Sequence, residues 1–459
     1  MPASNVSTCS IDFGKFRSAL HEVKLLDCRG YVTHVAGLTV ESAGPVLGLG
    51  ELCGIHLRDG RRVLAEVAGF RANHLILLPL SHIEGISPGD MVTARTTPRC
   101  ITLSEEVLGR VLNGLGEPID NRGPLRGSDN RPLDVCSPSP LNRAKITEPL
   151  ALGIRSIDGV LTCGKGQRVG IFSGSGVGKS VLLGDIANSS EAAVNVVALI
   201  GERGREVREF LEENLGPEGL ARSVVVVATS DSPPIQRVKA AFVAVTIAEY
   251  FRDKAKNVLF LMDSLTRFAQ AQREIGLAAG EPPAAKGYCP SVFSLMPRLV
   301  ERLGRAENGS TTGILTVLVE NDDLADPVAD SARSLLDGHI VLSRKLAERG
   351  HYPAVDILQS VSRLMPAVVN EQHKRAAQKL REIYATYMDA VDLINIGAFS
   401  PGSNRRIDGA VTLIDRINNF LVQPIRERTS YEETIRRLMT ITQSWDELIS
   451  AANEDSPIK

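Results

Sequence analysis

The chain has 459 residues, enough for about two to four domains and a sizeable buried core. Lysine and arginine total 52 against 54 acidic residues, so the formal net charge is −2 and there is no global basic field to hold nucleic acid. Aromatic residues make up 4% of the chain, which also disfavours a broad base-stacking surface.

The N-terminal residues 1–10 are polar, and no apolar segment follows a basic start, so the sequence predicts no secretory signal peptide. The most apolar stretch, residues 240–251, is too short to cross a bilayer and contains Glu249. The seven cysteines are scattered and form no CxxC pair, which disfavours a disulfide framework and a zinc site. We therefore expect a soluble protein of a reducing compartment.

Residues 1–98 combine a short segment of helical periodicity with a small β domain. Such a helix can pack on its own domain or be offered to a partner, and the spacing leaves both open. Aliphatic and β-branched runs, interrupted by glycine and proline, favour a small β-barrel or sandwich. The apolar positions of the helix are Phe13, Phe16, Leu20 and Val23, and the β runs are residues 30–39, 54–57, 63–67 and 74–78.

Residues 99–370 have a different pattern. A stretch rich in proline, glycine and polar residues, 121–140, indicates an extended connector. After it, apolar runs alternate with helical segments, which is typical of an α/β domain with a mostly parallel sheet buried on both faces. From residue 371 to 459 helical periodicity dominates, so we expect a helical domain there. The expected strands are residues 169–172, 194–200, 223–228, 258–262, 313–319 and 339–342.

A phosphate-binding loop follows the first of these strands and opens a predicted helix over residues 180–187. Its small residues let successive backbone N–H groups converge on phosphate oxygens, and the helix N-terminus adds positive potential. Lys179 would reach the β- and γ-phosphates of a nucleotide, and the Ser180 hydroxyl would ligate Mg²⁺. Ser173 stands where the strict pattern has glycine, but it is small enough for the loop to close. The loop residues are Ser173, Gly174, Ser175, Gly176, Val177, Gly178, Lys179, Ser180 and Val181.

Two acidic residues end other apolar strands of the same domain. Asp263 closes the run 258–262, which places a carboxylate at the carboxyl edge of the sheet, where it can hold Mg²⁺. Glu202 follows the run 194–200 and faces the same crevice. It can orient a water molecule and accept its proton, or it can be a helix-start glutamate favoured by the helix dipole. Spacing alone leaves both roles for Glu202 open.

These motifs together resemble the catalytic subunits of rotary-type ATPases, and most closely the export ATPases of flagellar and type III secretion systems. A small residue such as Ser173 at the first position of the P-loop resembles the sequences of the export ATPases. The resemblance implies an α/β, RecA-like P-loop core (99–370) with an N-terminal β-barrel (1–98) and a C-terminal helical domain (371–459). The further motifs that carry it are residues 109–112, 116–120, 153–159, 201–203, 263–268, 280–283, 287–288, 290–293, 337–344 and 353–363.

The resemblance also implies roles for individual residues. Arg363 is expected to be an arginine finger that reaches the nucleotide site of a neighbouring subunit, although a structural ion pair is the alternative. Tyr352 is expected to pack on the adenine ring, and by itself it could equally be a turn residue. Glu202 marks a working catalytic subunit, since subunits of this superfamily that do not hydrolyse nucleotide lack this carboxylate. Arg203 is similar to a family arginine near the γ-phosphate.

The expected activity is ATP hydrolysis, with Mg²⁺, by a homohexamer that drives protein export. The partners implied are a stator-like negative regulator, a central stalk protein, export substrates with their chaperones, and the inner-membrane export gate. The enzyme would be cytoplasmic and peripheral at the inner membrane, with no nucleic-acid partner. Residues 326–333 and 347–352 favour the flagellar branch over the virulence branch.

Three other functions remain as alternatives. The first is a catalytic subunit of an ion-translocating ATP synthase. Two observations oppose it: segment 392–399 resembles the export ATPases, and the chain has no match to the acidic tract by which synthase subunits contact their rotor. A hexameric nucleic-acid translocase is opposed by the net charge and the few aromatic residues. A non-hydrolysing nucleotide-binding scaffold is opposed by Glu202.

Overall fold

The computed structural model describes residues 28–95, 100–319 and 325–454. The chain divides into two compact units, Met1–Thr97 and Pro98–Lys459. The predicted N-terminal helix at residues 13–23 lies outside the described residues. Among those described, no helix is long and apolar enough to cross a membrane.

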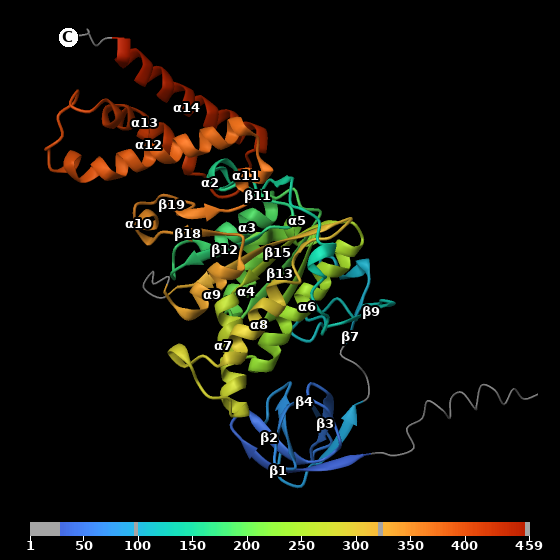
Figure 1. Cartoon of the computed structure of the whole chain (residues 1–459). Helices are drawn as coiled ribbons and strands as arrows, with labels where there is room; N and C mark the ends of the chain where they lie inside the picture. Colours follow the sequence, from blue (N-terminus) through green and yellow to red (C-terminus); the bar gives the residue numbers. More distant parts are fainter. Residues whose placement is uncertain (1–27, 96–99, 320–324, 455–459) are drawn as a thin grey trace, which may run out of the picture. The chain divides into compact units, whose positions relative to one another are not determined.

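The first unit contains a closed barrel with the strand order β1-β2-β5-β4-β3-β6 (Figure 1). The run 30–39, expected as one strand, is instead a hairpin, because a turn at Gly37 with φ of 56° separates β1 from β2. The last strand, β6, was not predicted, and it closes the barrel by pairing with β1 and β3. The strands are β1 (Arg29–Ala36), β2 (Thr39–Ala43), β3 (Leu52–His56), β4 (Arg62–Arg71), β5 (His74–Pro79) and β6 (Met91–Arg95).

The second unit is built on a nine-stranded sheet whose main path is β19-β18-β12-β17-β15-β13-β14-β8. The strands from β18 to β8 are parallel, whereas β19 runs antiparallel to β18 and β16 antiparallel to β17. Every residue of β13 and β14 is buried, which explains their continuous apolar sequences. The strands are β8 (Val111–Asn113), β12 (Arg168–Ser173), β13 (Val194–Ile200), β14 (Ser223–Ala228), β15 (Asn257–Asp263), β16 (Gly304–Arg305), β17 (Ser310–Leu318), β18 (Gly338–Leu342) and β19 (Val355–Ser362).

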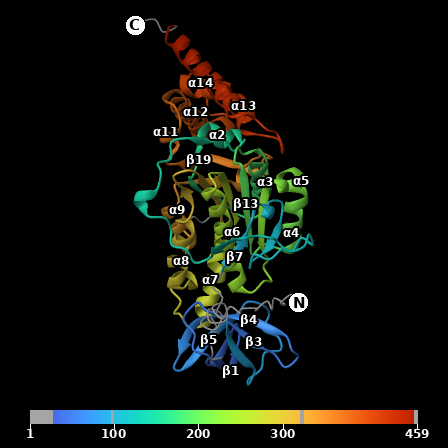
Figure 2. The same cartoon turned by 90° about the vertical axis from the view of Figure 1, so that its right-hand side faces the viewer.

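Helices cover both faces of this sheet. Figure 2 shows α3 and α5 on one side of β13 and α6 to α9 on the other. Two small antiparallel pairs stand apart, β7 (Cys100–Leu103) with β9 (Asp129–Pro132) and β10 (Pro149–Leu150) with β11 (Cys163–Gly164), so the expected connector contains a short strand. The helices are α2 (Arg155–Val160), α3 (Lys179–Ser189), α4 (Gly204–Glu209), α5 (Gly216–Ala221), α6 (Pro234–Asp253), α7 (Leu265–Ala279), α8 (Pro290–Val300), α9 (Pro327–Leu335), α10 (Arg344–Glu348) and α11 (Met365–Val368).

Three long helices follow, α12 (Glu371–Asn395), α13 (Arg405–Leu421) and α14 (Tyr431–Glu454). Two of them start at asparagine caps: Asn370 accepts from the backbone of His373, and Asn404 accepts from Arg406 and Ile407. All three pack against α2, and α12 also packs against β19 (Figure 1). One apolar core extends from the sheet into these helices. Because the core is continuous, it does not mark a boundary between two domains, and the boundary at residue 370 stays a prediction.

Candidate functional site

The phosphate-binding loop leaves the sheet at β12, which has a parallel neighbour on each side. Gly176 and Gly178 have φ of 80° and 84°, a left-handed conformation that favours glycine. α3 then begins at Lys179, and its first turn carries no side-chain cap. The uncapped N–H groups of that turn can therefore donate to an anion. Ser173 is buried below the loop and Ser180 is exposed at the helix start.

Lys179 lies against the carboxylate that ends β15. Its Nζ donates to Asp263 Oδ1 at 2.6 Å, and the Thr316 hydroxyl donates to the same oxygen at 2.8 Å. Thr316 can do so because its strand, β17, lies between β12 and β15 in the sheet. The carboxyl edges of three neighbouring strands thus gather an ammonium, a carboxylate and a hydroxyl at one point.

Glu202 lies at the same edge, two residues beyond the end of β13. Its Oε1 is 3.9 Å from Lys179 Nζ, and that oxygen is buried with no hydrogen-bond partner among the described residues. Burial, and then the charge of Asp263, raises the pKa of Glu202 to about 7, against the opposing effect of Lys179. A buried carboxyl oxygen without a partner needs a donor, and a water molecule beside a bound phosphate can supply one.

Gly201 sets the position of Glu202. Its φ is 71°, and a Cβ at this position would lie 2.8 Å from the Cβ of Arg267. Both facts require glycine between β13 and Glu202. Sterics therefore explain why the first residue of the predicted Gly201-Glu202-Arg203 motif is glycine.

The guanidinium groups of the two arginines of the expected site have other partners than Lys179, Asp263 and Glu202 among the described residues. Arg203 is 79% exposed and its guanidinium pairs with Glu206 at 2.6 Å. Arg363 is also exposed, and its Nη2 donates to the carbonyl of Arg333 at 3.2 Å. In the described part of the chain neither guanidinium bonds to Lys179 or its partners.

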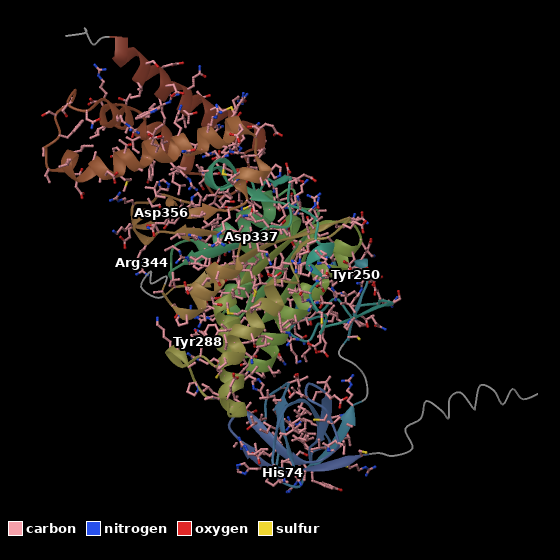
Figure 3. All side chains as sticks on the ribbon, viewed as in Figure 1. His74, Tyr250, Tyr288, Asp337, Arg344 and Asp356 are labelled. Atoms are coloured by element: carbon pink, nitrogen blue, oxygen red, sulfur yellow. The ribbon has the colours of Figure 1, made fainter. Side chains whose placement is uncertain are left out.

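The backbone of Arg363 is fixed to the strand that carries the P-loop. Its N–H donates to the carbonyl of Asp337 at 3.0 Å. Asp337, labelled in Figure 3, also accepts from the backbone N–H of Arg168 at 3.0 Å and pairs with the Arg168 guanidinium. Arg168 is the first residue of β12. One aspartate thus joins the exposed arginine to the start of β12, at the opposite end of that strand from the P-loop.

Tyr352 lies beside the phosphate-binding loop. A Cβ built on Gly178 would be 3.3 Å from Cε1 of the Tyr352 ring, and the tyrosine is 42% exposed. Its carbonyl accepts a hydrogen bond from the backbone N–H of Gln423 at 2.8 Å. An open aromatic face next to the P-loop can stack on a planar base.

Sequence reasoning missed two contributors to this region. Thr316 was counted only as part of an apolar strand, yet a hydroxyl in the aliphatic run 313–319 was a usable signal. Gln423 belongs to the helical region and lies 71 residues beyond Tyr352 in sequence, so no local pattern connects it with the site.

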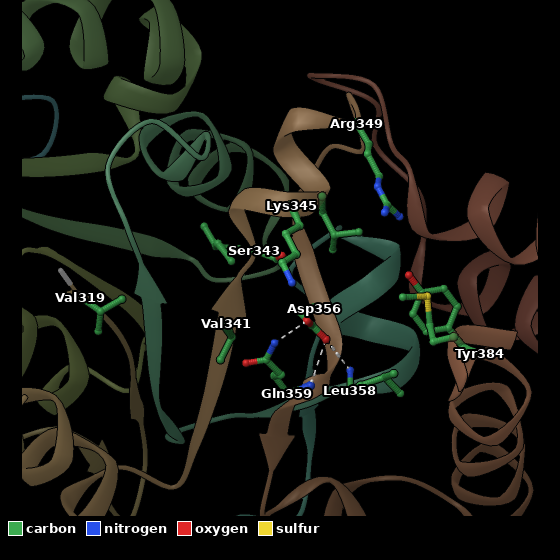
Figure 4. A pocket seen from close by; sticks show the side chains of 12 residues that line it. Val319, Val341, Ser343, Lys345, Arg349, Asp356, Leu358, Gln359 and Tyr384 are labelled. Carbon is green, nitrogen blue, oxygen red and sulfur yellow. Dashed lines mark hydrogen bonds between the residues drawn. The ribbon is translucent and has the colours of Figure 1, made fainter. Parts of the chain in front are cut away.

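A separate hollow of about 420 Å³ lies between β18, β19, α10 and α12 (Figure 4). Its central carboxylate, Asp356, accepts from the backbone N–H groups of Leu358 and Gln359 and from the Gln359 side chain. The carboxylate is therefore satisfied by its own strand. Nothing in this hollow matches the reactive grouping at Lys179.

The residues present fit a magnesium nucleotide. Carboxylate and hydroxyl oxygens, the ligands that Mg²⁺ prefers, come from Asp263 and Ser180. Lys179 supplies positive charge, and Glu202 has an oxygen free to accept from water.

Comparison with known proteins gives matches along most of the chain. Residues 32–95 match the β-barrel domain and 153–362 the nucleotide-binding domain of the ATP synthase alpha/beta family, while 369–440 match the T3SS EscN ATPase C-terminal domain. The flagellum-specific ATP synthase of Bacillus subtilis (strain 168) is 50% identical over 415 residues, 90% of this chain and 95% of the relative. The type 3 secretion system ATPase of Xanthomonas euvesicatoria is 47% identical over 414 residues, 90% of this chain and 94% of the relative.

The chain belongs to the flagellar and type III secretion ATPase family. It is therefore an ATPase, and the predicted architecture of barrel, P-loop core and helical domain is confirmed. A solved structure of the assembled ATPase EscN from the enteropathogenic E. coli type III secretion system is 45% identical, with a TM-score of 0.86 over 90% of this chain and 100% of that one. EscN in complex with its central stalk EscO matches with a TM-score of 0.84 at 44% identity, again over 90% and 100% of the two chains.

Proposed function

We propose that this ATPase hydrolyses ATP, with Mg²⁺, at the Lys179 cluster, and that it works as a homohexamer that energises flagellar protein export. The observation that carries the site is the grouping of Lys179, Asp263 and Glu202 at one sheet edge, with the Glu202 oxygen unpartnered. Ser180 and Asp263 hold the metal, which supplies charge neutralisation for the phosphates.

The protein groups divide the remaining work. The N–H groups at the start of α3 and the Lys179 ammonium bind the phosphate chain and offset its charge. Glu202 orients the attacking water and accepts its proton. The raised pKa suits this role, because a base whose pKa is near 7 takes a proton readily at neutral pH and releases it afterwards.

The position of Arg363 supports the proposed ring. Its guanidinium is exposed and bonds to no described member of its own Lys179 cluster, so a neighbouring subunit's site is where its charge is useful. Arg203 follows Glu202 in sequence and is exposed, and we assign it to the γ-phosphate region because it is similar to a family arginine there. The relative EscN is described as an assembled ATPase, which supports assembly of this chain too.

Mixing two inactive variants tests the shared site. Glu202→Gln subunits keep the arginine finger Arg363, and Arg363→Ala subunits keep the base Glu202. Because each site takes its base from one subunit and its arginine from the next, a mixed ring contains some sites with both groups. We expect each variant alone to be nearly inactive and the mixture to recover a measurable fraction of ATP turnover. Mixed rings verified by mass, but without recovered turnover, would show that the two residues do not act in one site.

The machine that the ring drives is proposed to be the flagellar export apparatus, at the cytoplasmic face of the inner membrane. Its partners would be a stator-like regulator, a central stalk protein, and export substrates with chaperones. The central stalk is supported by the EscN–EscO complex of the relative. Affinity capture of the tagged protein from its own cells should recover rod, hook or filament subunits with a stalk protein; virulence translocators would assign it to the virulence branch instead.

A further inference from the structure

The loop of residues 422–430, which joins α13 to α14, reaches the nucleotide site from the helical region. The backbone N–H of Gln423 donates to the carbonyl of Tyr352 at 2.8 Å. The backbone N–H of Arg426 donates to Asp185 on α3 at 3.2 Å. The loop therefore contacts both the backbone that carries Tyr352 and the helix that starts at Lys179.

The side chain of Gln423 anchors this loop to the nucleotide-binding core. It is 6% exposed, and both ends of its amide are bonded. Oε1 accepts from the backbone N–H of Arg155 at 2.9 Å, while Nε2 donates to the carbonyls of Gly153 at 2.8 Å and Glu427 at 2.7 Å. An amide with both ends engaged has one orientation, so the backbone beside Tyr352 is fixed relative to the start of α2.

Arg155 holds the rest of the loop. Its side chain is 3% exposed, and its Nε donates to the carbonyl of Phe420 at 2.9 Å and its Nη1 to the Thr429 hydroxyl at 3.2 Å. The same guanidinium bonds to the Glu427 carboxylate and to the carbonyl of Val422. A planar guanidinium can satisfy acceptors in several directions at once, which a lysine ammonium in the same place does poorly. All four acceptors belong to residues 420–429.

We propose that Arg155 and Gln423 are positioning residues for nucleotide binding: they hold the loop of residues 422–430 so that Tyr352 stays in place as a wall for the base. The inference rests on the proposed contact between Tyr352 and adenine. None of the hydrogen bonds that the structure describes for these two residues reaches the P-loop, so their effect passes through the loop of residues 422–430 and the Tyr352 backbone. When the loop is released, the base contact weakens while phosphate binding through Lys179 is kept.

Equilibrium binding of two ligands to the full chain tests this separation. ATP carries the base, and inorganic tripolyphosphate offers a phosphate chain without it. For Arg155→Lys and Gln423→Met we expect about tenfold weaker ATP binding, the loss of a hydrogen bond to a charged or buried group. Tripolyphosphate binding should be unchanged. The control Arg428→Ala, an exposed residue of the same loop, should change neither.

The outcomes separate the two proposals. An equal loss of both ligands, or full ATP affinity in the variants, would overturn the positioning role. If Tyr352→Ala also binds ATP normally, the proposed contact between Tyr352 and adenine is wrong. If Tyr352→Ala weakens ATP binding and Arg155→Lys does not, the adenine contact stands and only the positioning role is wrong.

A double variant covers the case in which Arg155→Lys does not fold. Gln423→Met added to Tyr352→Ala should weaken ATP binding no further, because the wall it positions is already gone. Additive losses in the double variant would mean that Gln423 acts on the site by another route. The milder Thr429→Val, which removes one acceptor of Arg155, should give a smaller loss confined to ATP.

Discussion

The ammonium of Lys179 donates to the carboxylate of Asp263 at 2.6 Å, while the carboxylate of Glu202 stands 3.9 Å from the same nitrogen. One positive charge thus lies between two negative ones at the carboxyl edge of the sheet. The ammonium offsets part of the repulsion between Asp263 and Glu202, and it lowers the pKa of Glu202 against the opposing effect of burial. The charge state of Glu202 is the part most open to measurement.

Turnover should follow the ionisation of Glu202. A base must be ionised to accept a proton, and the pKa of this carboxyl is raised to about 7, so activity is present above that pH and is lost below it. We expect kcat/KM for ATP to fall about tenfold per pH unit below about 7. Glu202→Gln should lower kcat by about 10² or more while still binding ATP, and its residual rate should lack this inflection. A wild-type profile that is flat from pH 5 to 8 would point to another base.

Removal of Lys179 leaves the two carboxylates facing one another. Lys179→Met should abolish detectable ATP binding and turnover, since phosphate charge is no longer offset. Lys165→Met is a suitable control, because Lys165 pairs with Glu148 at the surface, outside the site. Isothermal titration with ATP checks both, and ordinary ATP binding by Lys179→Met would refute the assignment of the loop.

Thr316 should matter for metal use. Its hydroxyl fixes Asp263, so Thr316→Val frees that carboxylate and should raise the Mg²⁺ concentration needed for half-maximal turnover about tenfold. Thr311 provides a matched control on the same strand, since its buried hydroxyl has no partner among the described residues. Thr311→Val should leave Mg²⁺ dependence and stability unchanged. Equal behaviour of the two variants in a Mg²⁺ titration would exclude a role for the Thr316 bond.

Gly201 and Gly204 form a second matched pair. Gly201→Ala combines a left-handed φ of 71° with a Cβ 2.8 Å from Arg267, and should lose about 2 kcal/mol or more in free energy of unfolding along with most activity. A Cβ on Gly204 would meet no atom of the described residues within 4 Å, so Gly204→Ala should be neutral or slightly stabilising. Urea unfolding with a parallel turnover assay measures both. Retained stability in Gly201→Ala would show that Arg267 moves aside at little cost.

Much of the site could be predicted from sequence because its main residues follow strands. In a parallel sheet, the residue after an apolar strand lies at the carboxyl edge, so Asp263 and Glu202 could be placed there without coordinates. The strands β8 and β19 were missed because the first is three residues long and the second, at the sheet edge, mixes buried, half-buried and exposed positions without a continuous apolar run.

Contacts between distant segments could not be predicted. Thr316 bonds to Asp263 only because β17 lies between β12 and β15 in the sheet. The local periodicity of a sequence predicts strands but not their order in a sheet. The same holds for Tyr352 and Gln423, which are joined by a hydrogen bond between backbone groups. Nearly any residue type can make such a bond, so the sequence gives no sign of it.

The bonds of Asp337 give the proposed ring a sense of direction. Asp337 holds the first residue of the strand that ends in a subunit's own P-loop, and it also holds the backbone of the arginine that serves the next subunit. Each subunit then has one neighbour that it assists and another that assists it, which makes every contact in the ring head-to-tail. Every interface of such a ring would therefore present the Arg363 side of one subunit to the nucleotide site of the next, in the same order all the way round.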